Sequence, residues 1–286
     1  MTAEVAVSLE VPAQDGRRPR ALSPSRAADF MHCPLLYRFR TIDRLPEPPD
    51  AMATRGTVVH AVLERLFDLA PEERTLEAAA ALIQPEWDAL LAAEPELAGL
   101  FAADQGQALD AWLASAEDLL ATYFDLEDPT RLRQAERELT VECELPSGVR
   151  LRGIVDRLDV APDGALRVVD YKTGRAPDER FEARALFQMK FYALVLWRTR
   201  GVIPRVLQLL YLGNREVLRY APDEADLRAT ERKVQALWAA ITQAEQRHDF
   251  RASPGRLCDW CSFHAQCPAQ GGELPPYPVI EDAHQG

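Results

Sequence analysis

Apolar and polar positions along this chain follow two different periods. Up to about residue 126, apolar residues recur every three or four positions, which is typical of amphipathic helices. A short helix is predicted over SPSRAADFMHC, where Ser23 suits the N-cap and Pro24 suits the first helical position. A second helix is predicted to begin near Arg55, in RGTVVHAVLERLFDLA, whose valines and leucines form one apolar stripe.

The segment 71–130 is rich in Ala, Leu and Glu and is predicted to be a helical insertion, with breaks near Pro85 and Pro95. It holds 14 acidic residues and one basic residue, Arg74, so its local charge of −13 exceeds the chain's net charge of −12 and the rest of the chain is nearly balanced. Residues 17–40, in contrast, carry six arginines against one acid. Because local charge decides where a polyanion binds, the acidic total does not exclude DNA as a partner.

From residue 137 the period becomes two, which predicts strands. The predicted strands ERELTVECEL, VRLRGIVDRLDVA and ALRVVDYKT are joined by the turns PSG and APDG. A helix is predicted over FEARALFQMKFYALVLWRTR, then a strand pair in RVLQLLYLG and REVLRYA, and a long helix over 222–248. This order of elements predicts an α/β fold with a mixed central sheet flanked by helices.

The composition is that of an ordinary soluble globular protein, with 47% hydrophobic and 27% charged residues among 286. No apolar run approaches the ~20 residues that cross a bilayer, and the first residues lack the pattern of a signal peptide. We therefore expect a cytoplasmic protein with no membrane partner. Residues 1–20 are predicted to be a flexible tail, 21–270 a single domain and 271–286 a second tail.

Two aspartates and a lysine lie on consecutive predicted strands, in GIVDRLD and VVDYKTG. Asp170 and Lys172 point to the same face of their strand, and suitable register would bring Asp156 beside them. Two carboxylates with water suit Mg²⁺ or Mn²⁺, which would polarise a phosphoryl oxygen and promote ionisation of a bound water. Lys172 would hold that water and offset charge developing on phosphorus.

This pattern predicts hydrolysis of a phosphodiester bond. The alternative is that Asp156, Asp159 and Lys172 are surface charges at strand ends. Two valines precede Asp170, however, and buried charges usually have a partner or a metal.

Three further residues fit a hydrolytic site. His60, on the predicted second helix, could complete a metal shell, more naturally for Mn²⁺ than for Mg²⁺. Gln188 and Tyr192 are four residues apart and share one helix face, where they could contact a DNA backbone or support Lys172. Taken alone, His60 would be an ordinary histidine, and Gln188 with Tyr192 a packing pair.

Three of the five cysteines form a C-x2-C-x5-C pattern at Cys258, Cys261 and Cys267. Clustered thiols in a cytoplasmic chain indicate a metal site, and a fourth ligand is then needed. Cys33 is the better candidate, because Cys143 alternates with apolar residues as a core residue would. Four thiolates suit either a [4Fe–4S] cluster or structural Zn²⁺, and the spacing does not separate them. Either centre would connect the two ends of the chain.

Together these motifs resemble the PD-(D/E)XK nuclease superfamily, and within it the RecB-like exonucleases that carry a four-cysteine iron–sulfur cluster. The resemblance runs from about Leu22 to Pro268 and is carried by SPSRAADFMHCPLLYRF, GTVVHAVLE, GIVDRLD, VVDYKTG, FQMKFYAL and CDWCSFHAQC. It implies a restriction-endonuclease-like core whose cysteine segment is 255–268, and it does not settle the role of the acidic insertion 71–130.

The resemblance also implies roles for individual residues. His60, Asp156, Asp170 and the backbone carbonyl of Tyr171 match metal-binding positions, and Lys172 matches the catalytic lysine. Gln188 and Tyr192 match an accessory catalytic motif. The four cysteines Cys33, Cys258, Cys261 and Cys267 match cluster ligands, which favours [4Fe–4S] over zinc. One departure is that Asp170 stands where many relatives have Glu.

We therefore expect a metal-dependent DNA exonuclease of repair or recombination, acting on DNA that is single-stranded or has free ends. If duplex unwinding is part of its task, a separate helicase must supply it. The alternative is a non-catalytic subunit that keeps the nuclease fold to bind DNA or protein.

Overall fold

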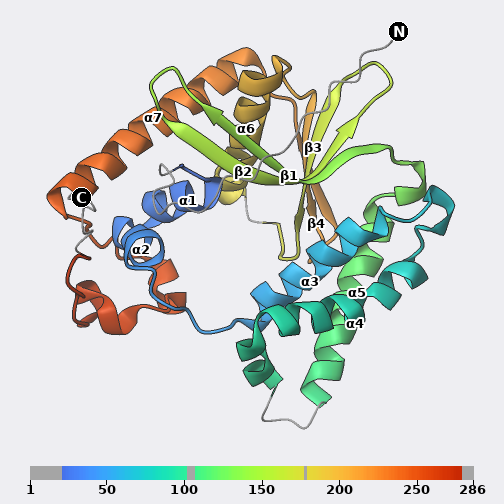
Figure 1. Ribbon diagram of the computed structural model, residues 1–286, viewed down its shortest axis with the longest axis horizontal. Coiled ribbons are helices and arrows are strands. Elements are labelled where there is room, and N and C mark those ends of the chain that lie inside the picture. The colour runs from blue at the N-terminus through green and yellow to red at the C-terminus, as the bar shows by residue number, and fades with distance from the viewer. Residues whose placement is uncertain (1–20, 102–106, 177–178, 279–286) are drawn as a thin grey trace, which may run out of the picture.

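The computed structural model describes residues 21–101, 107–176 and 179–278 (Figure 1). Its centre is one five-stranded sheet in the order β1-β2-β3-β4-β5. The strands are β1 Gln134–Glu144, β2 Arg150–Val160, β3 Leu166–Lys172, β4 Val206–Tyr211 and β5 Glu216–Tyr220. β3 and β4 are parallel, and the other neighbours are antiparallel. The predicted mixed sheet is confirmed.

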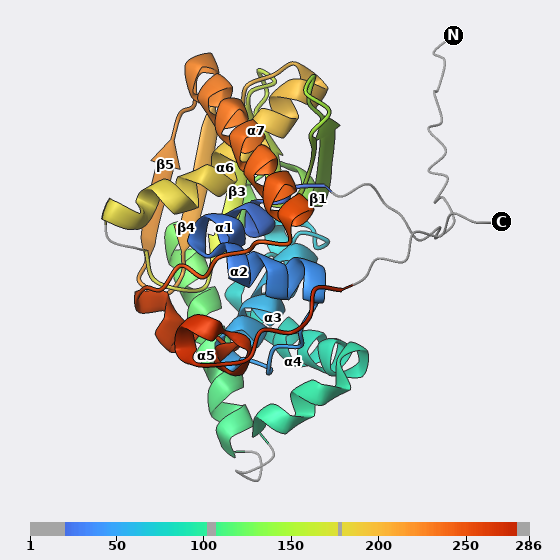
Figure 2. The same ribbon diagram turned by 90° about the vertical axis from the view of Figure 1, so that its left-hand side faces the viewer.

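Helices cover both faces of this sheet (Figures 1 and 2). One face packs on α1 Pro24–His32, α2 Pro34–Tyr37, α6 Glu179–Arg200 and α7 Glu224–Arg247. The other face packs on α3 Ala51–Leu66, α4 Leu76–Ala93 and α5 Gln107–Leu126. The side chains of β3 alternate between these layers, with Val168 in the first core and Val169 in the second. The α/β fold with flanking helices is therefore confirmed.

Two helix boundaries differ from the prediction. α3 begins at Ala51 and not near Arg55, because the Asp50 carboxylate accepts a hydrogen bond from the Ala53 N–H at 2.7 Å and caps the helix earlier. Pro85 does not break α4, which continues to Ala93. Ile83 and Trp87 on either side of this proline are buried in the second core, and that packing holds the helix together.

Arg157 in β2 connects the acidic helical segment to the sheet. Its guanidinium is fully buried, 2.8 Å from Glu127 after α5 and 3.0 Å from Asp159 in the same strand. It also donates to the Tyr171 hydroxyl at 2.6 Å. The packing of α5 on the sheet thus includes a buried ion pair next to Asp156.

Both predicted tails extend beyond the residues that the structure describes. Residues 1–20 and 279–286 lie outside them. Residues 271–278 contact the rest of the domain: Arg38 donates to the Pro275 carbonyl at 2.6 Å, and the Tyr277 ring stacks on His248 at 3.9 Å. Across the described ranges, no helix has the length and apolar character needed to cross a membrane.

Candidate active site

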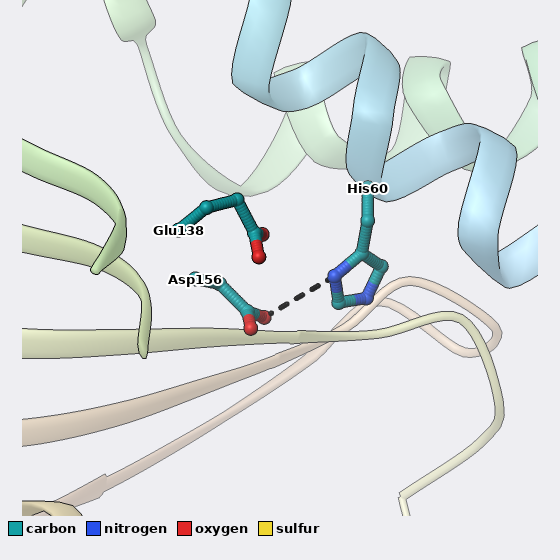
Figure 3. Close-up of side chains that lie close together, drawn as sticks. All are labelled: His60, Glu138 and Asp156. Carbon is teal, nitrogen blue, oxygen red and sulfur yellow. Dashed lines mark ion pairs between the residues drawn. The ribbon is translucent and has the colours of Figure 1, made fainter. Parts of the chain in front are cut away.

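His60, Glu138 and Asp156 bring three potential metal ligands together (Figure 3). They come from α3, β1 and β2 respectively. One ligand atom of each lies within 4.8 Å of the other two, and His60 Nδ1 is 3.5 Å from Asp156 Oδ2. Two carboxylates with one imidazole nitrogen suit Mn²⁺, and the carboxylates alone suit Mg²⁺. The chemistry of this donor set fits a divalent ion.

The backbone of Tyr171 in β3 connects His60 to Asp156. Its N–H donates to Asp156 Oδ2 at 2.7 Å, and its carbonyl oxygen lies 3.0 Å from His60 Nε2. If His60 Nε2 carries the proton of this hydrogen bond, Nδ1 presents its lone pair toward Asp156. The carbonyl to which the resemblance gives a metal-binding role therefore faces this group of ligands.

A second group of side chains surrounds Asp170 on the α6 side of β3. Lys172 Nζ lies 2.7 Å from Asp170 Oδ2 and donates to Gln188 Oε1 at 3.0 Å. Gln188 Nε2 donates to Asp170 Oδ1 at 2.8 Å and to the Tyr192 hydroxyl at 3.0 Å. The structure thus brings together the two strand residues and the two helix residues that the sequence singled out.

The strand register places the two groups next to each other. Arg157 pairs with Val169 across β2 and β3, and Asp156 and Asp170 each lie one residue beyond that pair. The carboxylate of Asp170 is almost completely buried, and Oδ2 has no hydrogen-bond partner among the described residues, although the Lys172 ammonium lies close to it. This buried oxygen thus faces the Lys172 ammonium, and a metal ion bound by Asp170 would share the carboxylate with Lys172.

Burial and mutual repulsion raise the pKa values of the acids. Burial, and then the nearby charge of Asp170, hold the pKa of Asp156 well above its usual range. Burial also raises the pKa of Glu138 and lowers the pKa of His60, which favours the neutral imidazole that a metal requires. Without a cation, the ionised carboxylates repel one another in a poorly solvated place.

Glu138 is the residue that the sequence analysis missed. In the alternating pattern of ERELTVECEL it occupies a polar position like Glu142 and Glu144, and nothing distinguishes it from them. In the structure it lies between the pairs Arg137–Arg157 and Leu139–Val155, directly across from Asp156. Its φ of 42° is a left-handed conformation that is rare for a residue with a side chain. That local distortion of β1 accompanies the approach of its carboxylate to Asp156.

Gly153 explains how Tyr192 comes so close to β2. A Cβ at this position would lie 2.6 Å from the Tyr192 ring, a distance at which real atoms clash. The glycine that opens GIVDRLD therefore leaves space for α6, which carries Gln188 toward Asp170.

Cys33, Cys258, Cys261 and Cys267 all line one large hollow, which we name the cysteine cleft. It has a volume of about 2760 Å³ and is walled by α1, α2, the start of β2, α6 and the segment 252–278. Figure 2 shows the C-terminal segment beside α2. Cys143 is not among the lining residues, and burial raises the pKa of its thiol to about 11.

The thiol surroundings bear on the kind of centre that the cysteines could hold. The N–H groups of Ser253 and Gly255 donate to Cys33 Sγ at 3.4 Å and Cys258 Sγ at 3.3 Å. In a tetrahedral zinc site the sulfurs would be roughly 3.8 Å apart. Over the described part of the chain, no three of these sulfurs lie within 4.8 Å of one another. This arrangement by itself does not select between zinc and an iron–sulfur cluster.

Comparisons with known proteins identify the family of this chain. The family model of the PD-(D/E)XK nuclease superfamily matches residues 21–268. The Gene 69 protein of Mycobacterium phage L5 is 24% identical over 288 residues, which covers 86% of this chain and 95% of that protein. The Gene 69 protein of Mycobacterium phage D29 is 28% identical over 204 residues, or 63% of this chain and 70% of that protein.

One solved structure is similar along most of the chain. It is a protein from Eubacterium rectale that is provisionally named an exonuclease, with a TM-score of 0.57 and 13% identity. The likeness covers 84% of this chain and 86% of that one. At this identity it demonstrates the shared fold.

Proposed function

Because the chain belongs to the PD-(D/E)XK nuclease superfamily, we propose that it is a metal-dependent DNA exonuclease. The observation that carries this proposal is the contact network of Asp170, Lys172 and Gln188 beside the ligand group of His60, Glu138 and Asp156. A protein that only binds DNA or a partner has no need of this network. The non-catalytic alternative is therefore the less favoured one.

The residues that would hold the divalent ion are His60, Glu138, Asp156 and Asp170, with the Tyr171 carbonyl. Mg²⁺ or Mn²⁺ bound there would polarise a phosphoryl oxygen and lower the pKa of water. The fit rests on buried acids whose pKa values are raised, because such carboxylates are stabilised by a cation.

Lys172 would orient the attacking water and offset the negative charge that grows on the phosphate as the bond to water forms. It remains in place because Asp170 and Gln188 hold its ammonium from two sides. Gln188 would act as a positioning residue that fixes the rotamers of Asp170 and Lys172 together. Tyr192 would keep the Gln188 amide in the required orientation.

Attack at DNA ends is the finer part of the proposal. It is supported by the sequence resemblance to RecB-like exonucleases and by the provisional name of the Eubacterium rectale protein. We place the activity in DNA repair or recombination, on single-stranded DNA or DNA with free ends. A separate helicase would provide any unwinding.

We further propose that Cys33, Cys258, Cys261 and Cys267 hold a [4Fe–4S] cluster. The sequence resemblance, the common cleft and the two N–H···S hydrogen bonds support it. A cluster there would connect α1 to the C-terminal segment, which are more than two hundred residues apart in sequence. Structural Zn²⁺ is the alternative.

The catalytic proposal is tested with Asp170→Asn and Lys172→Ala on DNA labelled separately at the 5′ and 3′ ends, in Mg²⁺ or Mn²⁺. Both variants should lose cleavage by more than a hundredfold. Asp163→Asn is a matched control, because Asp163 lies in an exposed turn with Arg205. Equal cleavage by wild type and Asp170→Asn would refute the proposed site.

A circular substrate distinguishes exonuclease activity from nuclease activity in general. An exonuclease should degrade linear single-stranded DNA and leave a covalently closed circle of the same sequence intact. If the circle is cut as fast as the linear form, the exonuclease assignment is wrong while the nuclease assignment stands. No metal-dependent cleavage by the wild type would favour the non-catalytic alternative.

The cluster is tested on protein purified without oxygen. Iron–sulfur binding predicts a brown protein with absorption near ~400 nm, which Cys261→Ser should lose together with stability. Cys143→Ser is the matched control and should keep the colour. A colourless wild-type protein with one zinc per chain would replace the assignment by the zinc alternative.

A further inference from the structure

The cysteine cleft extends from the C-terminal segment to the candidate active site. Its lining includes Gln188 and Tyr192, which contact the Asp170 network, and Trp260, which lies between two of the cysteines. Gly153 and Ile154 of β2 also line it, three and two residues before Asp156. A ligand lying in this cleft would therefore reach the proposed catalytic residues.

Exposed apolar side chains gather in this cleft. Of eight large hydrophobic residues that are exposed in the described part of the chain, four line it: Met31, Ile154, Leu257 and Trp260. Trp260 is 76% exposed, the largest fraction of the eight. An indole left this open is costly to hydrate and usually marks a contact surface.

The charge of the cleft is opposite to that of the whole chain. Six arginine and lysine side chains line it against three acids, although the net charge of the protein is −12. Two of its cations are neutralised locally, because Arg40 pairs with Asp29 and Arg150 pairs with Glu142. The other four form no ion pair with any described residue: Arg26, Arg44, Arg152 and Lys233. Unpaired cations in an acidic protein favour a polyanionic ligand.

We infer that the cysteine cleft binds one single strand of nucleic acid, with a base stacked on Trp260 and phosphates near Arg152. This inference rests on the proposed nuclease function, since the cleft would then lead the strand to Asp170 and Lys172. An indole can stack only on a base whose face is free, so a paired and stacked duplex would not use it. Aromatic stacking combined with basic side chains along the backbone is the general way in which single strands are held.

The test measures binding without cleavage. A fluorescent 20-nucleotide oligo(dT) is titrated with the full-length protein in EDTA, and its anisotropy gives the affinity. Trp260→Ala should weaken binding about fivefold to a hundredfold, which is the effect of losing one base–aromatic stack. Trp260→Phe should keep most of the affinity, because a phenyl ring still stacks.

Arg152→Ala provides a readout that a merely structural defect would not change. Removing one phosphate contact should reduce the slope of log affinity against log salt by about 0.7. Val202→Ala is the matched control, because Val202 is an exposed apolar residue outside the cleft and should leave binding unchanged.

Three outcomes would overturn the inference. The first is that Trp260→Ala binds oligo(dT) as tightly as the wild type. The second is that Trp260→Ala and Trp260→Phe lose equal affinity. The third is that Trp260→Ala weakens binding to a blunt duplex of the same length as much as binding to the single strand. Because the assay contains no metal, its result is separate from the nuclease test. If the protein binds the strand through Trp260 but cleaves no DNA, only the proposed function is refuted. If the protein cleaves DNA but Trp260→Ala keeps its affinity for oligo(dT), only this inference is refuted.

Discussion

The Gln188 side chain donates a hydrogen bond to Asp170 at 2.8 Å while its carbonyl oxygen accepts one from Lys172 at 3.0 Å. One amide thus bridges the Asp170 carboxylate and the Lys172 ammonium, which lie two residues apart in β3. Its orientation is determined by this arrangement, because only the NH2 group can donate to the carboxylate and only the oxygen can accept from the ammonium.

Gln188→Ala should therefore lower kcat for DNA hydrolysis by about tenfold to a hundredfold and change KM little, since outer hydrogen-bonding partners of a metal site usually contribute that much. Steady-state kinetics on end-labelled DNA measures it. Gln84→Ala is the control, because Gln84 makes a similar bond to Asp88 at 2.7 Å on the surface of α4. An unchanged kcat in Gln188→Ala would contradict the positioning role.

Glu138→Gln should weaken Mn²⁺ binding by about tenfold or more, because an amide oxygen replaces a charged ligand across from Asp156. The rise in melting temperature on adding Mn²⁺ reports this affinity, since a ligand that binds only the folded state stabilises it. Glu144→Gln, at an exposed position of the same strand, should leave the Mn²⁺ response unaltered. Equal responses of the two variants would remove Glu138 from the site.

Asp156→Asn should stabilise the metal-free protein at neutral pH. The pKa of Asp156 is raised in the folded state by burial and by Asp170, so the folded state binds its proton more tightly than the unfolded state. Ionisation then costs stability as pH rises above the unfolded pKa of about 3.9. Melting curves in EDTA should show a higher melting temperature for the variant at pH 7, and the difference should vanish near pH 4 and below.

The sign of that pH dependence is what makes the prediction specific. A variant that was stabilised equally at pH 4 and pH 7 would act through packing and not through the charge of Asp156. Adding Mn²⁺ should reverse the order at pH 7, because the wild type alone gains the full binding energy.

Arg157→Met should destabilise the fold by up to about 3–5 kcal/mol, because Glu127 and Asp159 lose their fully buried partner and keep only the more exposed Arg167. Urea denaturation measures the free energy of unfolding. Arg200→Met is the surface control, since the Arg200–Glu136 pair is well exposed and should contribute less than about 1 kcal/mol. If the two variants lose similar stability, the Arg157 network is not a major support of the sheet.

The sequence by itself determined the elements and the class of fold. Alternating residues in β1, β2 and β3 and helical periods elsewhere predicted a mixed sheet between helices, because side-chain periodicity is a local consequence of backbone geometry. The same local patterns predicted less well where individual helices begin and end. The Asp50 cap moved the start of α3, and packing around Trp87 overrode Pro85.

Only the tertiary structure decided that Glu138 joins the polar residues that the sequence singled out. Glu138 looks like any outward-facing strand residue, and its place across from Asp156 comes from strand register and one left-handed φ. The gathering of Trp260, Arg152 and Gln188 around one cleft joins segments from three parts of the chain. Such neighbours depend on how helices and strands pack over long separations, and no local period in a sequence encodes that.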